Sequence, residues 1–187
     1  MTKSDKQRII EILAASFREN KSTNFVIKQD RKREARLRKL IEYSIFYGNN
    51  FGKIYLSGDR NSCAIVLDTE KKKTTFLSIL WDLRLVFKCI GAKNIGKVLK
   101  RESLIKAHHP KDGFIHLWYI GVIPSEQGKG LGTKLINQVI ANAKSEDKAI
   151  YLETSTERNF AYYKNLGFKE TSSFDQLGYS IKMFTLN

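Results

Sequence analysis

Hydrophobic residues recur every three or four positions in several segments of the chain, which is the spacing of one helix face. This spacing predicts helices over residues 5–19, 31–47, 75–90, 92–107, 131–143 and 159–166. Ser4, followed three residues later by Gln7, predicts a capping box at the start of the first helix. Gly91 separates the third helix from the fourth, and Gly167 ends the last one as a C-terminal glycine cap.

Runs rich in β-branched and aromatic residues predict the strands. They cover residues 53–56, 62–67, 114–122, 149–153, 168–174 and 179–186. The turn signal Ser57-Gly58-Asp59 predicts a hairpin between the first two strands. Strand, helix and strand follow one another across residues 114–154, which predicts a right-handed βαβ unit with two parallel neighbours. No repeat or linker interrupts the pattern, so we expect one mixed α/β domain over residues 1–187.

Basic residues dominate the first part of the chain. Lys and Arg outnumber Asp and Glu by 14 to 7 in residues 1–60, by 10 to 4 in residues 61–110, and by 9 to 8 in residues 111–187. Of the net charge of +14, +13 therefore lies in the first 110 residues. Either an anionic partner or a solvated basic surface accounts for this excess. The basic runs at 31–33 and 36–39 carry no interleaved aromatic residues that would stack on bases, so we expect no specific nucleic-acid partner.

The chain carries no signal-peptide pattern and no apolar run long enough to cross a bilayer. The most apolar window, residues 76–90, is interrupted by Asp82, Arg84 and Lys88. We therefore expect a cytoplasmic protein without a membrane partner. Cys63 and Cys89 have neither metal-ligand nor redox spacing, which indicates two free thiols in a reducing compartment and no metal site.

Three glycines at every second position, Gly128, Gly130 and Gly132, follow a predicted strand and open a helix. Without Cβ atoms in the way, the backbone N–H groups there can converge on an anion, and the helix dipole favours one. A nucleotide-binding P-loop would need the order Gly-Lys-Ser/Thr, and a dinucleotide fingerprint would need a third glycine at Thr133. A plain tight turn before a helix remains the simpler alternative.

Two motifs together resemble a known family. The spacing Gln127-x-x-Gly130-x-Gly132, preceded by Val122-x-Pro124, resembles the acetyl-CoA motif of the GNAT superfamily of N-acetyltransferases. The segment 159–168, Asn-Phe-Ala-Tyr-Tyr-Lys-Asn-Leu-Gly-Phe, resembles the second motif of the same superfamily. The resemblance covers residues 114–170 and is only topological before them. Leu152-Glu153-Thr154 is also similar to the branch with puromycin-type acetyltransferases.

The resemblance implies an α+β fold, with a mixed, mostly antiparallel sheet, one splayed parallel pair and flanking helices. It implies acetyl-CoA as cosubstrate, with Asn159 on the cofactor's arm and Tyr163 protonating the departing thiolate. A core aromatic residue is the alternative interpretation of Tyr163. The backbone of the strand end would bind pantetheine through Ile120, Gly121 and Val122. The turn would wrap the pyrophosphate with Gln127, Gly128, Lys129, Gly130, Leu131, Gly132 and Thr133.

The chain departs from the family pattern in two places. Family members usually begin with a strand, so that strand is missing here or residues 1–4 are its remnant. Many relatives also carry a catalytic carboxylate four residues before the Val of Val-x-Pro, and that position is Trp118. The general base is then another residue, a water-mediated group, or unnecessary for a neutral amine. Candidate bases are His116, Glu153, His108, His109 and Glu102.

The expected reaction is direct acetyl transfer from acetyl-CoA to the primary amine of a small molecule or peptide. Neither cysteine lies in a motif, so nothing indicates a covalent intermediate. The alternatives are a basic RNA- or ribosome-associated module and an acyl-CoA sensor, both on this fold without turnover. Several aromatic residues suit either the core or an acceptor pocket, namely Phe46, Trp81, Phe87, Trp118 and Tyr119.

Overall fold

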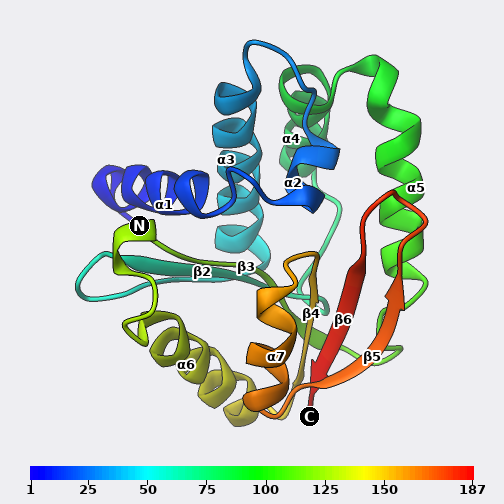
Figure 1. The fold of residues 1–187 in the computed structure, drawn as a ribbon. Helices are drawn as coiled ribbons and strands as arrows, with labels where there is room; N and C mark the ends of the chain where they lie inside the picture. Colours follow the sequence, from blue (N-terminus) through cyan, green and yellow to red (C-terminus); the bar gives the residue numbers. More distant parts are fainter.

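A computed structural model describes all residues from 1 to 187, and its centre is one six-stranded sheet in the order β1-β2-β3-β4-β6-β5 (Figure 1). Every neighbouring pair is antiparallel except β3 and β4, which are parallel. The predicted mixed, mostly antiparallel sheet with one parallel pair is confirmed. The strands are β1 (Gly52–Leu56), β2 (Ser62–Asp68), β3 (Phe114–Val122), β4 (Ala149–Thr154), β5 (Lys169–Phe174) and β6 (Ile181–Leu186).

Helices cover both faces of the sheet, with α1 and α3 on one face and α6 on the other (Figure 1). The predicted helices are found within a few residues of their expected ends, and Gly91 and Gly167 end segments with positive φ values of 77° and 90°. The short helix α2 was not predicted. The helices are α1 (Lys3–Ser16), α2 (Lys21–Val26), α3 (Arg33–Phe51), α4 (Phe76–Leu85), α5 (Ile95–Lys106), α6 (Leu131–Ser145) and α7 (Arg158–Asn165).

The cap of the first helix is Thr2, two residues earlier than the predicted cap Ser4. Thr2 Oγ1 accepts the Asp5 N–H at 3.0 Å, and the Asp5 carboxylate accepts the Thr2 N–H at 3.2 Å. The capping box predicted at Ser4 and Gln7 was therefore wrong, because an Asp serves as the reciprocal acceptor as well as a Glu or Gln does. Residues 1–4 form no strand, so they are not a remnant of the family's first strand.

The parallel pair is joined over only three residue pairs, Phe114 with Ala149, Ile115 with Ile150 and His116 with Tyr151. Beyond them β3 and β4 separate. Trp118 is an extra residue in β3, because Leu117 lies opposite Val66 while Tyr119 lies opposite Ile65. A bulge bends a strand and increases its local twist. The bulged residue lies two positions after His116, the last residue of β3 that pairs with β4.

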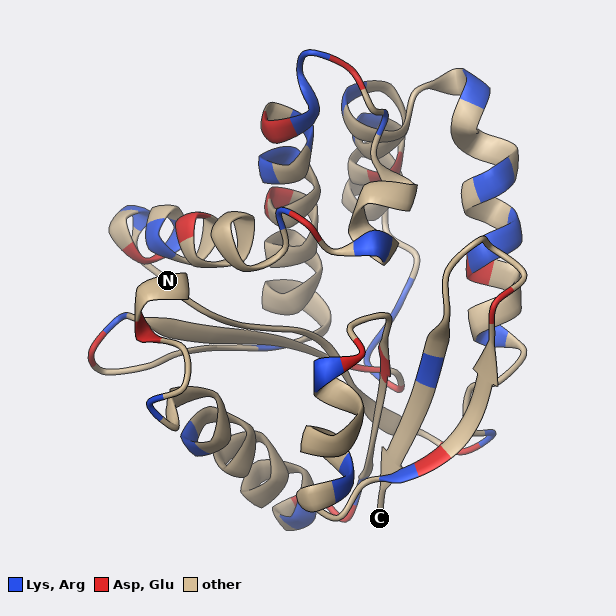
Figure 2. Cartoon of the chain, viewed as in Figure 1, with Lys and Arg blue, Asp and Glu red and all other residues tan.

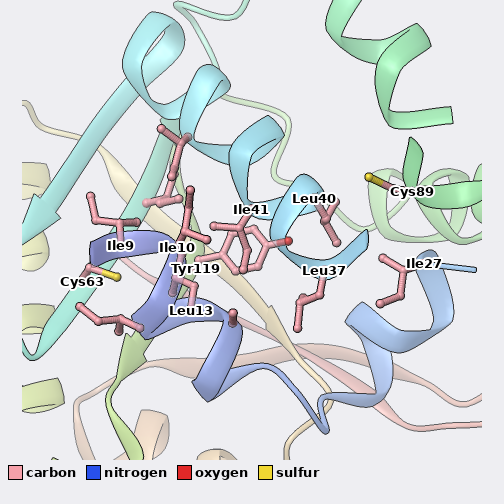
Figure 3. Close-up of a cluster of buried hydrophobic side chains, with 14 residues drawn as sticks. Ile9, Ile10, Leu13, Ile27, Leu37, Leu40, Ile41, Cys63, Cys89 and Tyr119 are labelled. Atoms are coloured by element: carbon pink, nitrogen blue, oxygen red, sulfur yellow. The ribbon is translucent and has the colours of Figure 1, made fainter. Parts of the chain in front are cut away.

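Alternation along β2 supplies two cores, one on each face of the sheet. Cys63 and Ile65 pack with residues of α1 and α3, whereas Ala64 and Val66 pack with α6. Figure 3 shows the first of these clusters, in which Ile10, Leu13 and Ile41 lie next to Tyr119.

Both cysteines are buried free thiols, as predicted. Burial raises the pKa of Cys63 to about 12 and that of Cys89 to about 11. Neither thiol is a nucleophile at neutral pH, because the thiolate is the reactive form.

Positive charge is prominent on α3 and α5, as expected from the sequence (Figure 2). None of the helices has both the length and the apolar character that a membrane crossing would need.

Candidate active site

A cavity of about 570 Å³ opens where β3 and β4 separate. Its walls come from both strands, from the segment joining α1 to α2, from the glycine turn before α6, and from α5 and α7. The structure brings together on this wall most of the predicted site residues: Ile120, Gly121, Val122, Gln127, Gly128, Gly130, Leu131, Gly132, Thr133, Glu153, Asn159 and Tyr163. Two predicted residues, Lys129 and His116, do not line it.

The glycine turn presents a row of backbone donors to the cavity. Gly128 and Gly130 have φ values of 82° and 77°, a left-handed conformation that strains other residues. The first N–H donated back into α6 is that of Lys134, to the Gly130 carbonyl at 3.0 Å. The amides from Gly128 to Thr133 therefore have no backbone acceptor and remain free to bind a ligand. Unpaired amides at a helix N-terminus form an anion site.

Lys129 does not line the cavity. Its Nζ lies 2.9 Å from Glu126 Oε2 on the exposed side of the turn. An exposed pair of this kind contributes little to stability, and it partly cancels the positive charge that the sequence suggested. Its direct contact with a cofactor stays a prediction.

The end of β3 is held in place by side chains that meet at the Val122 carbonyl. Ser16 Oγ donates to this oxygen at 2.8 Å and Gln127 Nε2 donates at 3.1 Å. A Cβ on Gly121 would lie 2.9 Å from Leu13 Cδ2 and 3.0 Å from Ser16 Oγ, so a larger residue here would force these side chains of α1 to shift. The Val122 carbonyl is thus already bonded within the protein. Further back, Ile120 lies on the cavity wall past the last residue paired with β4.

His116 and Glu153 form a buried pair across the parallel strands. His116 Nε2 lies 2.8 Å from Glu153 Oε2, and each side chain is 12% exposed. Burial alone would raise the pKa of Glu153, but the charge and hydrogen bond of His116, with Arg101 nearby, lower it to about 2. Glu153 is therefore ionised at neutral pH and faces the cavity, while His116 lies behind it.

The other candidate bases lie away from the cavity. His108 is exposed, and its Nδ1 lies 2.8 Å from the Leu104 carbonyl oxygen. Burial, and then the proximity of His116, lower the pKa of His109 to about 4. Glu102 is paired with Arg101. None of these three residues lines the cavity.

Two consecutive tyrosines of α7 occupy different parts of the wall. Tyr163 is only 4% exposed and packs on Phe168 and Phe184, with ring centroids 5.6 and 5.8 Å away. Burial raises its pKa, so it stays neutral and able to donate a proton. The Tyr162 hydroxyl instead lies 3.5 Å from Thr133 Oγ1, at the glycine turn. Tyr163 thus combines both interpretations, because it is a core aromatic residue that also faces the cavity.

The aromatic residues proposed for an acceptor pocket divide into two groups. Trp118 and Tyr119 line the cavity. Phe46 and Trp81 stack on each other with centroids 5.0 Å apart and do not line it, and Phe87 is 72% exposed. Only the bulge region of β3 therefore supplies aromatic surface to the site from this set.

Several wall residues were not predicted from the sequence, including Ser16, Ser22, Arg101 and Arg158. Three of them lie in helices outside both motifs, and α2 is too short to show an apolar stripe. Arg158 directly precedes the second motif, so its position was the one available signal.

Residues 69–168, more than half of the chain, match the model of the acetyltransferase (GNAT) family. The chain belongs to this family. It is therefore an enzyme of the acetyltransferase type, and the resemblance found in the two motifs is confirmed.

Solved structures of GNAT proteins share the fold of this acetyltransferase over nearly its whole length. One is described as histone acetyltransferase HPA2 and related acetyltransferase from Corynebacterium glutamicum, with 22% identity, a TM-score of 0.69, and 99% of this chain and 92% of that chain covered. Arylalkylamine N-acetyltransferase 2 from Aedes aegypti has 14% identity and a TM-score of 0.69, with 100% and 95% covered. Drosophila melanogaster polyamine N-acetyltransferase has 12% identity and a TM-score of 0.58, with 98% and 95% covered.

Proposed function

We propose that this acetyltransferase is a single domain over residues 1–187 that transfers acetyl from acetyl-CoA directly to a primary amine. One observation carries the proposal: the free amides from Gly128 to Thr133 open into the same cavity as Glu153 and Tyr163. An anion site and a set of acid–base groups are thus connected by one continuous space.

The cofactor's phosphates would lie on the glycine turn, where the unpaired amides and the α6 dipole favour negative charge. Arg158 lies beside this turn, with Nη2 3.4 Å from Gln127 Oε1, and adds a positive charge to the wall. The pantetheine arm would follow the edge of β3 past Ile120, with Asn159 on the facing wall. In this arrangement the thioester reaches the part of the cavity that holds Tyr163 and Glu153.

In the chemical step the amine nitrogen attacks the thioester carbonyl, an N–C bond forms and the C–S bond breaks. Tyr163 would donate its proton to the departing sulfur, since its hydroxyl is neutral and makes no hydrogen bond within the protein. The amine must lose a proton, and Glu153 would receive it with His116 paired behind it. A carboxylate with a pKa of about 2 is a poor base alone, so the pair is proposed to act as a unit.

Direct transfer through a ternary complex is favoured over a covalent acyl-enzyme. Both thiols are buried in the core, and neither lines the cavity. Nothing in the wall therefore provides an activated cysteine nucleophile.

The test is a coupled measurement of acetyl-CoA binding by calorimetry and of free thiol release with a panel of primary amines. Saturable binding with amine-dependent thiol release is expected. Failure to bind either acetyl-CoA or coenzyme A would refute the proposal. Binding without turnover of any amine would favour the sensor alternative.

A further inference from the structure

Two opposite charges face the cavity on the side away from the glycine turn. Arg101 of α5 and Glu153 of β4 both line it, and their side chains are only 11% and 12% exposed. Figure 1 shows α5 and α6, which the glycine turn precedes, on opposite sides of β4. Two buried charges therefore line the cavity away from the proposed phosphate site.

Arg101 and Glu153 form no salt bridge with each other, because no nitrogen of Arg101 lies within 4.0 Å of a Glu153 oxygen. Each is paired with another residue instead. Glu153 Oε2 is bonded to His116, which leaves Oε1 without a protein donor. Arg101 Nε and Nη2 donate to Ser22 Oγ at 3.2 and 2.6 Å, and Nη1 donates to Glu102.

Both groups keep spare hydrogen-bonding capacity. A guanidinium has five N–H donors, and Arg101 uses three of them. A buried donor or acceptor that is left without a hydrogen-bond partner is costly, even where its charge is paired elsewhere. A ligand that supplies an anion to Arg101 and a cation to Glu153 satisfies both at once.

We infer that the acetyl acceptor is an amino-acid-like zwitterion, with its ammonium on Glu153 and its carboxylate on Arg101. The inference rests on the proposed function and names its substrate class. A guanidinium fork matches the geometry of a carboxylate. An amine without a carboxylate leaves the spare Arg101 donors unpaired in a buried site, and such sites strongly reject ligands that lack the expected polar group.

The competing interpretation is that Arg101 only ties α5 to α2 through Ser22. That role makes no distinction between acceptors with and without a carboxylate. Matched pairs of acceptors therefore separate the two interpretations.

The experiment measures kcat/KM at saturating acetyl-CoA for an amino acid and the amine that lacks only its carboxylate. Suitable pairs are lysine with cadaverine, and phenylalanine with phenethylamine. We expect the preferred amino acid to exceed its partner by at least about tenfold, as for a lost hydrogen bond to a charged group. Equal rates, or faster turnover of the bare amine, in every pair would overturn the inference while leaving the proposed function intact.

Variants of Arg101 test whether this residue causes the preference for acceptors with a carboxylate. Arg101→Gln is expected to reduce the ratio of the two kcat/KM values at least about tenfold, and Arg101→Lys to reduce it less, because charge is kept but the fork is lost. Arg158→Gln removes another cavity arginine, beside the glycine turn, and serves as the control that weakens acetyl-CoA binding but keeps the ratio. An unchanged ratio in a folded Arg101→Gln variant would refute the role of Arg101. If that variant does not fold, Arg101→Lys and the wild-type pairs decide.

No turnover of any acceptor would count against the proposed function instead. Calorimetry with the coenzyme A-bound protein then tests the inference alone. Tighter binding of the amino acid than of its decarboxylated partner supports it, and the reverse order overturns it.

Discussion

Gly130 offers the sharpest test of where the pyrophosphate binds. Its φ of 77° places it in the left-handed region, and a Cβ there would meet no atom within 4 Å. Asp tolerates this conformation better than most residues, so Gly130→Asp should fold at a cost of about 1–2 kcal/mol. A carboxylate about 5 Å from one phosphate charge adds a repulsion of about 1–3 kcal/mol at effective dielectric constants between 80 and 20. The expected loss of acetyl-CoA affinity is therefore about 5- to 150-fold.

Gly178 provides the matched control. Its φ is 82°, an added Cβ would also meet nothing within 4 Å, and it does not line the cavity. Gly178→Asp carries the same backbone cost and the same added charge, away from the glycine turn. Calorimetric titration of both variants with acetyl-CoA, alongside thermal melts, isolates the local effect. A Gly130→Asp affinity within about twofold of the Gly178→Asp affinity would show that the phosphates bind elsewhere.

Three further predictions concern the chemistry and the charges of the site. Tyr163→Phe should lower kcat and kcat/KM together by about 10²–10⁴-fold with little change in acetyl-CoA affinity, because the ring still packs and only the proton is lost. Near-normal turnover across the pH range would show that Tyr163 is a packing residue and would make Tyr162 the next candidate for the general acid. Acetyl-CoA affinity should fall as salt is raised from 0.05 to about 0.5 M, because phosphate binding at an exposed turn is screened; a salt-independent affinity would contradict an electrostatic site. The pKa of Glu153 falls from 4.5 to about 2 on folding, so its contribution to the free energy of unfolding is present above pH 4.5 and is lost as pH falls toward 2, on the order of 3 kcal/mol in all. In urea melts, the stability of Glu153→Gln should therefore depend less on acid pH than that of the wild type. The same pH dependence in both proteins would show that the pair with His116 does not hold the carboxylate ionised.

The sequence predicted the parts of the fold that depend on local pattern. Strand β3 has its predicted bounds, and the strand–helix–strand unit and the glycine turn before α6 follow from hydrophobic spacing and glycine placement. The first helix cap was misplaced, because Thr2 and Ser4 are equally good caps by composition and only the backbone conformation distinguishes them.

The candidate site was predictable where a motif carried it and not elsewhere. Residues of the glycine turn lie on the cavity wall because the turn itself makes the site. Arg101 lies 52 residues before Glu153 in the chain and reaches the same cavity only because α5 packs, through Ile105, in a buried cluster with Tyr151 of β4 and Met183 of β6. Neither spacing nor composition relates two residues so far apart.

The short pairing of β3 with β4 divides the sheet into two halves of three strands, β1-β2-β3 and β4-β6-β5. By comparison, β2 and β3 share seven paired positions. The boundary between the halves has fewer paired positions than any other strand pair of the sheet, and the cavity lies where this pairing ends. A molecule bound in the cavity contacts both halves of the sheet and links them. Binding should therefore restrict the motion of the two halves relative to each other, and it should slow hydrogen exchange in β3 and β4 more than in the edge strands β1 and β5.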